Sequence, residues 1–205
     1  MAPQGTRPGK SRRKGPVEQG QLRLIAGEWR RRQLQFPAVD GVRPTPDRVR
    51  ETLFSWLLPQ LPGSRCLDLF AGSGVLGLEA LSRGAAFATF VDQSSGLCRA
   101  LRDNLALLNA SHRGEVQQQS CQDFLARGTD SPCQLVFMDP PYGQGLIAPL
   151  CQALEHHGWL APGAMICVEQ ESTAVAPVVP PRWQLHRHKQ AGQVSVFLFQ
   201  IKENG

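Results

Sequence analysis

Blocks of apolar and polar positions alternate along the middle of the chain. Five short segments are candidate strands: 65–70, 87–92, 115–119, 135–139 and 164–169. Four longer stretches between them are consistent with helices: 75–83, 95–109, 121–127 and 146–157. Strands and helices in alternation indicate a parallel sheet with crossover helices on both faces. The pattern therefore predicts an α/β fold.

The two ends of the chain differ from this pattern. Residues 183–188 and 194–201 flank a glycine-containing segment and predict an antiparallel hairpin, which makes a mostly parallel sheet of seven strands. Leu22–Gly27 and Gln33–Phe36 predict a second, small hairpin. Residues 1–20 have almost no apolar side chains, and we expect them to be disordered. The sequence thus predicts three regions: a basic tail at 1–20, a hairpin extension at 21–45 and one domain at 46–205.

A helix is predicted directly after the hairpin extension. Thr45 suits its N-cap, Pro46 its first helical position and Asp47 its first turn. The apolar face of this helix follows at helical spacing: Val49, Leu53, Phe54, Leu57 and Leu58.

The composition is that of a globular protein. The chain has 205 residues, of which 41% are apolar, enough for one domain with a sizeable core. No apolar run approaches the ~20 residues of a membrane helix, and the N-terminus lacks the apolar stretch of a secretory signal. The six cysteines and five histidines show no zinc spacing. We therefore expect reduced thiols, no metal site, no membrane partner and a cytoplasmic location.

Positive charge is concentrated in the first quarter of the chain. Residues 1–50 carry a net charge of +8 and the remainder −3, which gives the overall +5. A basic extension beside a nearly neutral domain is typical of proteins that bind a phosphate backbone. A solubilising tail would give the same pattern.

A glycine-rich loop follows the first predicted strand of the domain. Asp68 to Gly77 reads D-L-F-A-G-S-G-V-L-G, a G-x-G-x-x-G loop between a strand and a helix. Such a loop lets the backbone approach a ligand closely, although a tight turn without a ligand has the same composition. Asp92 ends the next strand, at a position that suits hydrogen bonds to a ribose.

Both a nicotinamide cofactor and S-adenosylmethionine carry adenosine, and the loop alone does not separate them. Asp68 would repel a pyrophosphate, whereas it suits the amino group of methionine. Asp123, after the third strand, could accept a hydrogen bond from the adenine amine, or it could be the N-cap or a first-turn acid of the next helix. Asp68 therefore favours S-adenosylmethionine, and so does the segment at 139–142, which ends a later strand at the same edge of the sheet.

The strand at 135–139 ends in Asp139-Pro140-Pro141-Tyr142. The two prolines stiffen the turn and remove two backbone donors, which leaves spare carbonyl groups. A carboxylate and a carbonyl held beside an aromatic ring can bind a flat group that carries an NH2, such as a nucleobase. A plain turn would also accommodate the two prolines.

These motifs together resemble the RsmD family of Rossmann-like class I methyltransferases. The resemblance rests on the glycine loop, on D-P-P-Y, and on R-P-T at 43–45 followed by R-V-R-E-T-L-F at 48–54. It covers residues 22–201. The family methylates N2 of a guanine in 16S ribosomal RNA of the bacterial small subunit, so the resemblance implies this activity, S-adenosylmethionine as cofactor and rRNA, free or in an assembled particle, as partner. We expect a monomer.

The resemblance also implies site residues. The catalytic set is Asp139, Pro140, Pro141 and Tyr142. The expected cofactor contacts are Asp68, Phe70, Ala71, Gly72, Ser73, Gly74, Gly77, Asp92, Gln93 and Asp123. The expected RNA contacts are Arg30, Arg31, Arg32, Arg43, Thr45, Arg48 and Arg50.

Two alternatives remain at the level of sequence. A DNA adenine-N6 methyltransferase also uses D-P-P-Y, although this chain has no room for a separate DNA-recognition domain. A ribosome-assembly protein that binds RNA without catalysis is the other alternative, and the set of acids at Asp68, Asp92 and Asp139 argues against it.

Overall fold

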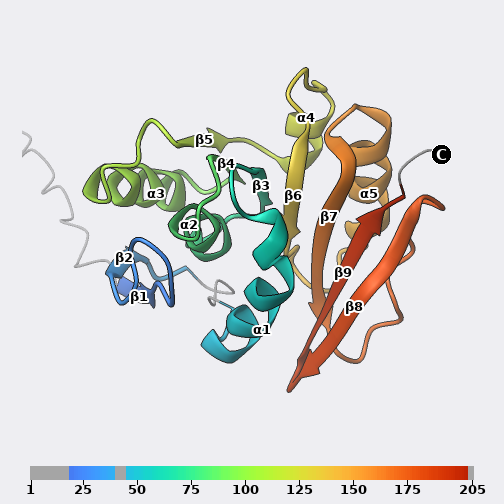
Figure 1. The fold of residues 1–205 in the computed structure, drawn as a ribbon, viewed down its shortest axis with the longest axis horizontal. Helices are drawn as coiled ribbons and strands as arrows, with labels where there is room; N and C mark the ends of the chain where they lie inside the picture. Colours follow the sequence, from blue (N-terminus) through green and yellow to red (C-terminus); the bar gives the residue numbers. More distant parts are fainter. Residues whose placement is uncertain (1–18, 40–44, 203–205) are drawn as a thin grey trace, which may run out of the picture.

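The computed structural model of the protein describes residues 19–39 and 45–202. Its main sheet has seven strands in the order β5-β4-β3-β6-β7-β9-β8 (Figure 1). Its strands are β3 (Arg65–Leu69), β4 (Phe87–Asp92), β5 (Gly114–Gln118), β6 (Cys133–Met138), β7 (Leu160–Glu171), β8 (Trp183–Ala191) and β9 (Val194–Ile201). Strands β3 to β7 are parallel, whereas β9 runs antiparallel to both β7 and β8. This arrangement confirms the predicted fold class.

The helices cover both faces of this sheet. They are α1 (Asp47–Leu57), α2 (Val75–Ser82), α3 (Ser95–Leu107), α4 (Cys121–Leu125) and α5 (Ile147–His156), with a short 3-10 turn η1 (Leu58–Gln60) after α1. None of the helices within residues 19–39 and 45–202 is long and apolar enough to cross a membrane. All six cysteines are buried free thiols, as predicted.

The N-terminal hairpin pairs β1 (Gln19–Arg23) with β2 (Gln33–Pro37) and lies beside α2 and α3 (Figure 1). Gln19 and Gly20 belong to β1, so the boundary expected at residue 20 is wrong by at least two residues. Residues 1–18 lie outside the described residues. The predicted strand at Leu22–Gly27 is also misplaced, because the backbone amides of Ile25 and Ala26 turn to the carboxylate of Glu79 instead of to a neighbouring strand.

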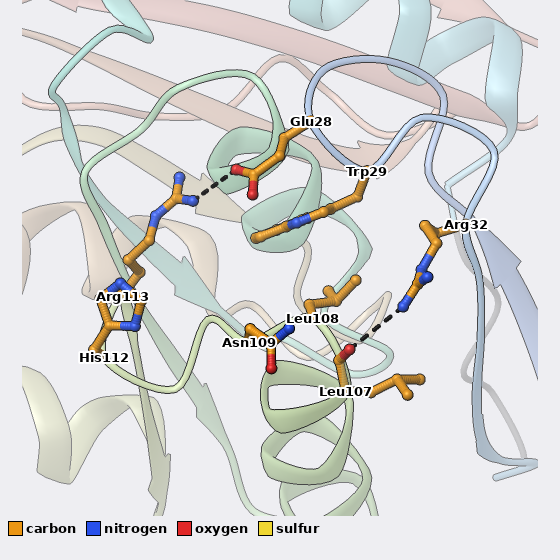
Figure 2. A pocket seen from close by; sticks show the side chains of 8 residues that line it. All are labelled: Glu28, Trp29, Arg32, Leu107, Leu108, Asn109, His112 and Arg113. Atoms are coloured by element: carbon orange, nitrogen blue, oxygen red, sulfur yellow. Dashed lines mark hydrogen bonds and ion pairs between the residues drawn. The ribbon is translucent and has the colours of Figure 1, made fainter.

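A pocket of about 420 Å³ lies where this hairpin meets the domain (Figure 2). Arg113 lines the pocket and donates to Glu28 Oε2 at 2.9 Å and to the Leu81 carbonyl at 2.7 Å. Arg32 donates to the Leu107 carbonyl at 3.3 Å. The donors of Arg113 therefore serve to fasten the hairpin to the domain.

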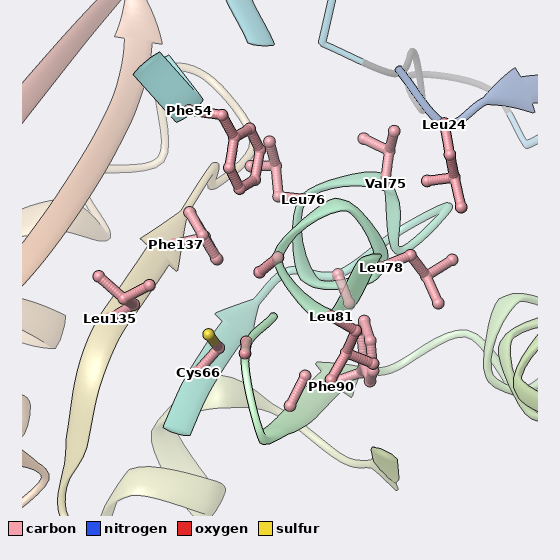
Figure 3. Close-up of a cluster of buried hydrophobic side chains, with 14 of the residues drawn as sticks. Leu24, Phe54, Cys66, Val75, Leu76, Leu78, Leu81, Phe90, Leu135 and Phe137 are labelled. Atoms are coloured by element: carbon pink, nitrogen blue, oxygen red, sulfur yellow. The ribbon is translucent and has the colours of Figure 1, made fainter. Parts of the chain in front are cut away.

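Two apolar clusters fill the two faces of the sheet, because β3 and β6 are covered on both sides. Alternate residues of each strand enter different clusters: Cys66 joins the first and Leu67 the second. Figure 3 shows the first cluster, in which Phe54 of α1 meets Phe137 of β6 with 5.9 Å between ring centroids. Leu24, from the segment after β1, joins this cluster, so the hairpin shares the core of the domain.

Helix α1 starts differently from the sequence prediction. Pro46 is the N-cap, not the first helical residue, and no side chain caps the helix. The Thr45 hydroxyl instead donates to Glu169 Oε2 on β7 at 3.2 Å. The N-cap role of Thr45 is therefore wrong, because a buried acceptor from a distant strand takes its hydroxyl. Asp47 lies in the first turn, as predicted.

Candidate active site

The parallel strands all end at one edge of the sheet, which we call the carboxyl edge. Asp68 lies near the end of β3 and Asp92 ends β4. Asp139 directly follows β6, and Glu169 lies near the end of β7. The turn between β8 and β9 is at the same edge, since Val194 pairs with Glu171. Such an edge is where open α/β sheets bind their ligands.

The glycine loop between β3 and α2 depends on glycine at three positions. Gly72 and Gly74 have φ of 54° and 76°, in the left-handed region that other residues rarely adopt. At Gly77 the difficulty is space, because a Cβ would lie 2.3 Å from the ring of Phe90. Phe70 also has a positive φ, 62°. The loop therefore holds α2 unusually close to β3 and β4.

Asp68 is a buried carboxyl with one backbone partner. Its Oδ2 accepts from the Gly77 amide at 2.9 Å. Burial raises the pKa of Asp68 to about 8, with Asp139 and Asp92 adding smaller effects in the same direction against the lowering effect of the Gly77 hydrogen bond. A cationic group that lies next to such a buried carboxyl stabilises its ionised form.

Asp92 shapes the loop from the neighbouring strand. One of its oxygens accepts from the Gly72 amide and the other from the Ser94 amide, both at 2.8 Å. The carboxylate is only half-buried, so it can accept further hydrogen bonds from solvent or from a ligand. Gln93, next to it, is exposed and Ser73 is buried.

Asp123 lies in the first turn of α4, whose N-cap is Ser120. The Ser120 hydroxyl donates to Asp123 Oδ2 at 2.7 Å, and the Asp123 amide donates back to Ser120 Oγ at 3.0 Å. Asp123 is therefore a first-turn acid, one of the roles left open by the sequence. Asp123 remains exposed, and its contact with an adenine remains a prediction.

The D-P-P-Y segment lies between the glycine loop and β7. Met138 pairs with Leu69 on one side and with Val168 on the other, so Asp139 leaves the sheet between these two strands. Burial raises the pKa of Asp139 to about 6. Pro140 is buried, whereas Tyr142 is 45% exposed and its ring is accessible.

Glu169 was missed by the sequence prediction. It is 6% exposed, although it lies at the end of an apolar strand. Burial and, next, the neighbouring Asp139 raise the pKa of Glu169 to about 8, against the lowering effect of the Thr45 hydrogen bond. The signal was present as an acid after Ile166-Cys167-Val168, at the carboxyl end of a predicted strand.

The residues predicted to contact RNA divide into three groups. Arg30, Arg31, Arg32 and Arg48 are exposed. Arg43 lies outside the described residues. Thr45 and Arg50 are 5% and 1% exposed, which contradicts a direct RNA contact for either in this structure.

Arg50 is buried because the chain itself uses its donors. Its guanidinium donates to the Thr45 carbonyl at 3.0 Å and to the Arg23 carbonyl at 3.1 Å. It also pairs with Asp47 and, at 3.4 Å, with Glu79. The function of Arg50 is therefore to join α1, α2 and the end of β1.

A second pocket, of about 290 Å³, lies at the carboxyl edge between α1 and the β8–β9 turn. Arg48 and Lys189 line it together with Gln190 and the turn residue Gly192. Lys189 was not predicted from the sequence. Two cations around a hollow at this edge can hold an anion such as a phosphate.

Comparisons with known proteins agree with this geometry. A family model described as conserved hypothetical protein 95 matches residues 22–200. Ribosomal RNA small subunit methyltransferase D of Escherichia coli strain K12 is 47% identical over 186 residues, 91% of this chain and 93% of that protein. The protein of the same name from Haemophilus influenzae is 43% identical, over 90% of this chain and 96% of its own length.

Solved structures give the same result. A structure titled putative methyltransferase yhhF from Escherichia coli superposes with a TM-score of 0.82 at 49% identity, covering 90% of this chain and all of that one. An RNA methyltransferase from Salinibacter ruber in complex with S-adenosyl-L-homocysteine shares the fold, with a TM-score of 0.61 at 18% identity, 80% of this chain and 96% of that one. The carboxyl edge, with its glycine loop and D-P-P-Y segment, thus occurs in a chain that belongs to the RsmD family, the family of ribosomal RNA small subunit methyltransferase D.

Proposed function

We propose that the protein transfers a methyl group from S-adenosylmethionine to the exocyclic N2 amine of a guanine in small-subunit rRNA. The observation that carries the proposal is the position of Asp139. It follows β6, the strand that pairs directly with β3, and β3 leads into the glycine loop. A cofactor on the loop and a base amine at Asp139 would therefore be neighbours. The names and 43–47% identities of the relatives support the reaction and the substrate.

The residues at the glycine loop fit S-adenosylmethionine. Asp68 is a buried carboxyl that a cation would stabilise, and the methionine part carries an ammonium group. Asp92 keeps acceptor capacity for ribose hydroxyls, while Gly72 and Gly74 keep the loop free of side chains. When bound, the cofactor supplies a methyl group on a sulfonium, with a thioether as leaving group.

The D-P-P-Y segment would prepare the amine. Asp139 and the Pro140 carbonyl accept hydrogen bonds from the NH2 group, which directs the nitrogen lone pair toward the methyl and stabilises the positive charge that develops. A pKa of about 6 leaves Asp139 largely ionised near neutral pH, so it can also take the proton that the amine loses. Tyr142 stacks on the base.

The RNA must present an unpaired or flipped base, at a cost of a few kcal/mol. Stacking on Tyr142 returns roughly 1–3 kcal/mol. Arg48 and Lys189 are placed to hold the phosphate backbone at the carboxyl edge, and Arg30 and Arg31 extend the basic surface over the hairpin. We infer that the enzyme acts as a monomer in the cytoplasm, on free rRNA or on an assembling particle.

The experiment is transfer of labelled methyl from S-adenosylmethionine to small-subunit rRNA or particles that lack the mark, with duplex DNA as the competing acceptor. Label in the rRNA is the expected result. Label confined to DNA would indicate an adenine-N6 methyltransferase instead. A protein that binds S-adenosylmethionine in calorimetry and labels neither acceptor would contradict the proposal.

A further inference from the structure

Two carboxyl groups lie near each other at the carboxyl edge, Asp139 directly after β6 and Glu169 on the neighbouring parallel strand β7. Met138 and Val168, the last pair of these two strands, directly precede them, and Asp139 is close enough to raise the pKa of Glu169. Phe137 and Cys167, two residues earlier, pair with each other and both lie in the first apolar cluster. Because side chains alternate along a strand, Glu169 leaves β7 on that same face, where Thr45 contacts it.

Glu169 is fixed in place but has few partners. Thr45 donates to its Oε2 at 3.2 Å, which holds the side chain in one orientation. No Lys or Arg among residues 19–39 and 45–202 forms an ion pair with Asp139 or Glu169. Burial and the nearby Asp139 raise the pKa of Glu169 to about 8. A ligand that donates hydrogen bonds to both carboxyl groups would favour their ionised forms and offset this burial.

We propose that Glu169 is the residue that selects guanine, by accepting a hydrogen bond from N1–H while Asp139 and the Pro140 carbonyl accept from N2. The inference rests on the proposed function. Guanine presents N1–H and the N2 amine next to each other on its Watson–Crick edge, so two neighbouring acceptors match it. Adenine has a bare ring nitrogen at N1, which would leave the ionised form of Glu169 facing another acceptor.

This assignment gives the site a property that D-P-P-Y lacks. Asp139 and Pro140 recognise an NH2 group, which guanine and adenine both carry. Glu169 recognises the ring next to that amine. A buried polar group built to accept one hydrogen bond discriminates strongly against a base that cannot donate it. Base selection is thus assigned to β7 and to its contact with Thr45.

The test uses 2-aminopurine, a base that keeps the 2-amine and has no hydrogen on N1. The methylated position is first mapped with wild-type enzyme, and RNA of that sequence is then made with guanine or 2-aminopurine at the target. For wild type we expect kcat/KM to favour guanine by about 10- to 100-fold. For Glu169→Ala we expect kcat/KM on guanine to fall by a similar factor. The value on 2-aminopurine should stay within about threefold of that of wild type.

Glu169→Gln is the conservative variant, and its carboxamide can donate to a bare N1. It should raise the rate on 2-aminopurine and lower the rate on guanine. Unchanged binding of S-adenosylmethionine in calorimetry verifies that each variant is folded. If Glu169→Ala does not fold, the near-isosteric Glu169→Gln carries the test alone. Equal losses on both bases, or an unchanged preference, would overturn the assignment. Failure of wild type to methylate guanine N2 at all would instead overturn the proposed function.

Discussion

The buried acid Glu79 and the acids of the carboxyl edge have opposite surroundings. Glu79, on α2, is fully buried and receives hydrogen bonds from the Ile25 and Ala26 amides and ion pairs from Arg50 and Arg83. Asp68, by contrast, has a single backbone donor at 2.9 Å. At the carboxyl edge no arginine or lysine of the described residues pairs with Asp68, Asp139 or Glu169.

The difference distinguishes an acid that stabilises the fold from acids that are available to a ligand. Glu79 is paired by the chain itself, and the pairing ties the N-terminal hairpin to α1 and α2. Burial raises the pKa of Asp68, Asp139 and Glu169, and such perturbed groups are typical of sites that bind ligands. Removing an edge acid should therefore affect activity and spare the fold, whereas removing Glu79 should do the reverse.

The largest effect is expected for Asp139→Ala. Loss of the carboxylate that orients the amine should lower the methyl-transfer rate about 10²- to 10⁴-fold, with S-adenosylmethionine binding retained. Single-turnover transfer to rRNA measures the rate and calorimetry the binding. Asp130→Ala, at an exposed acid in the loop before β6, is the matched control and should leave both unchanged. Full activity of Asp139→Ala would show that the site is elsewhere.

Glu79→Ala should show the opposite behaviour. It leaves the buried guanidinium of Arg50 without its Glu79 partner, so the free energy of unfolding should fall by about 3–5 kcal/mol. Denaturant titration measures the loss. Glu28→Ala removes an exposed carboxylate that pairs with Arg113 and should change stability by less than about 1 kcal/mol. Equal losses for the two variants would contradict the architectural role of Glu79.

Asp68→Asn tests the state of the unpaired acids through pH. The pKa of Asp68 rises from 3.8 to about 8, so the folded, cofactor-free protein holds a proton that the unfolded chain releases. The contribution to stability is therefore greatest below pH 4 and is lost as the pH rises toward 8. Asp68→Asn should flatten this decline in a series of thermal melts. An unchanged decline would mean that Asp68 is ionised in the free protein.

Cofactor binding should reverse the same shift. An ammonium beside Asp68 lowers its pKa, so binding of S-adenosylmethionine near pH 7 should release protons. Calorimetry in buffers of different ionisation enthalpy detects this release. Asp68→Asn should abolish most of it and weaken binding by about 10-fold or more. Proton uptake by wild type would contradict the predicted contact.

The smallest effects are expected at the basic surface. Arg48→Ala should weaken RNA binding modestly and lower the slope of log K against log salt by about 1. Arg182→Ala is the matched control. Arg182 directly precedes β8, at the edge of the sheet opposite the carboxyl edge, and pairs with Glu155. If the salt slope fell equally in both variants, the pocket lined by Arg48 and Lys189 would not be a specific RNA contact.

Most of the fold could be predicted from the hydrophobic periodicity and the turn residues of the sequence. Four of the five parallel strands were predictable because their apolar runs are buried on both faces. The polar strand β5 was predictable only from its place in the alternation of strands and helices, and the terminal hairpin because glycine interrupts it. Thr45 was misassigned because its partner, Glu169, is 124 positions away and no local pattern reports such a contact. Arg50 was misassigned for the same reason: its charge suggested RNA, whereas its distant partners come from α2 and the end of β1. Local chemistry was visible in the sequence, and pairing across strands was not.

The central claim is that the carboxyl edge methylates N2 of guanine. It is tested most directly by digesting rRNA labelled by wild-type enzyme to nucleosides and identifying the labelled species by mass spectrometry. The account predicts N2-methylguanosine at one position, formed about 10²- to 10⁴-fold more slowly by Asp139→Ala. A methyl group on a ring nitrogen, on a ribose or on adenine would contradict it.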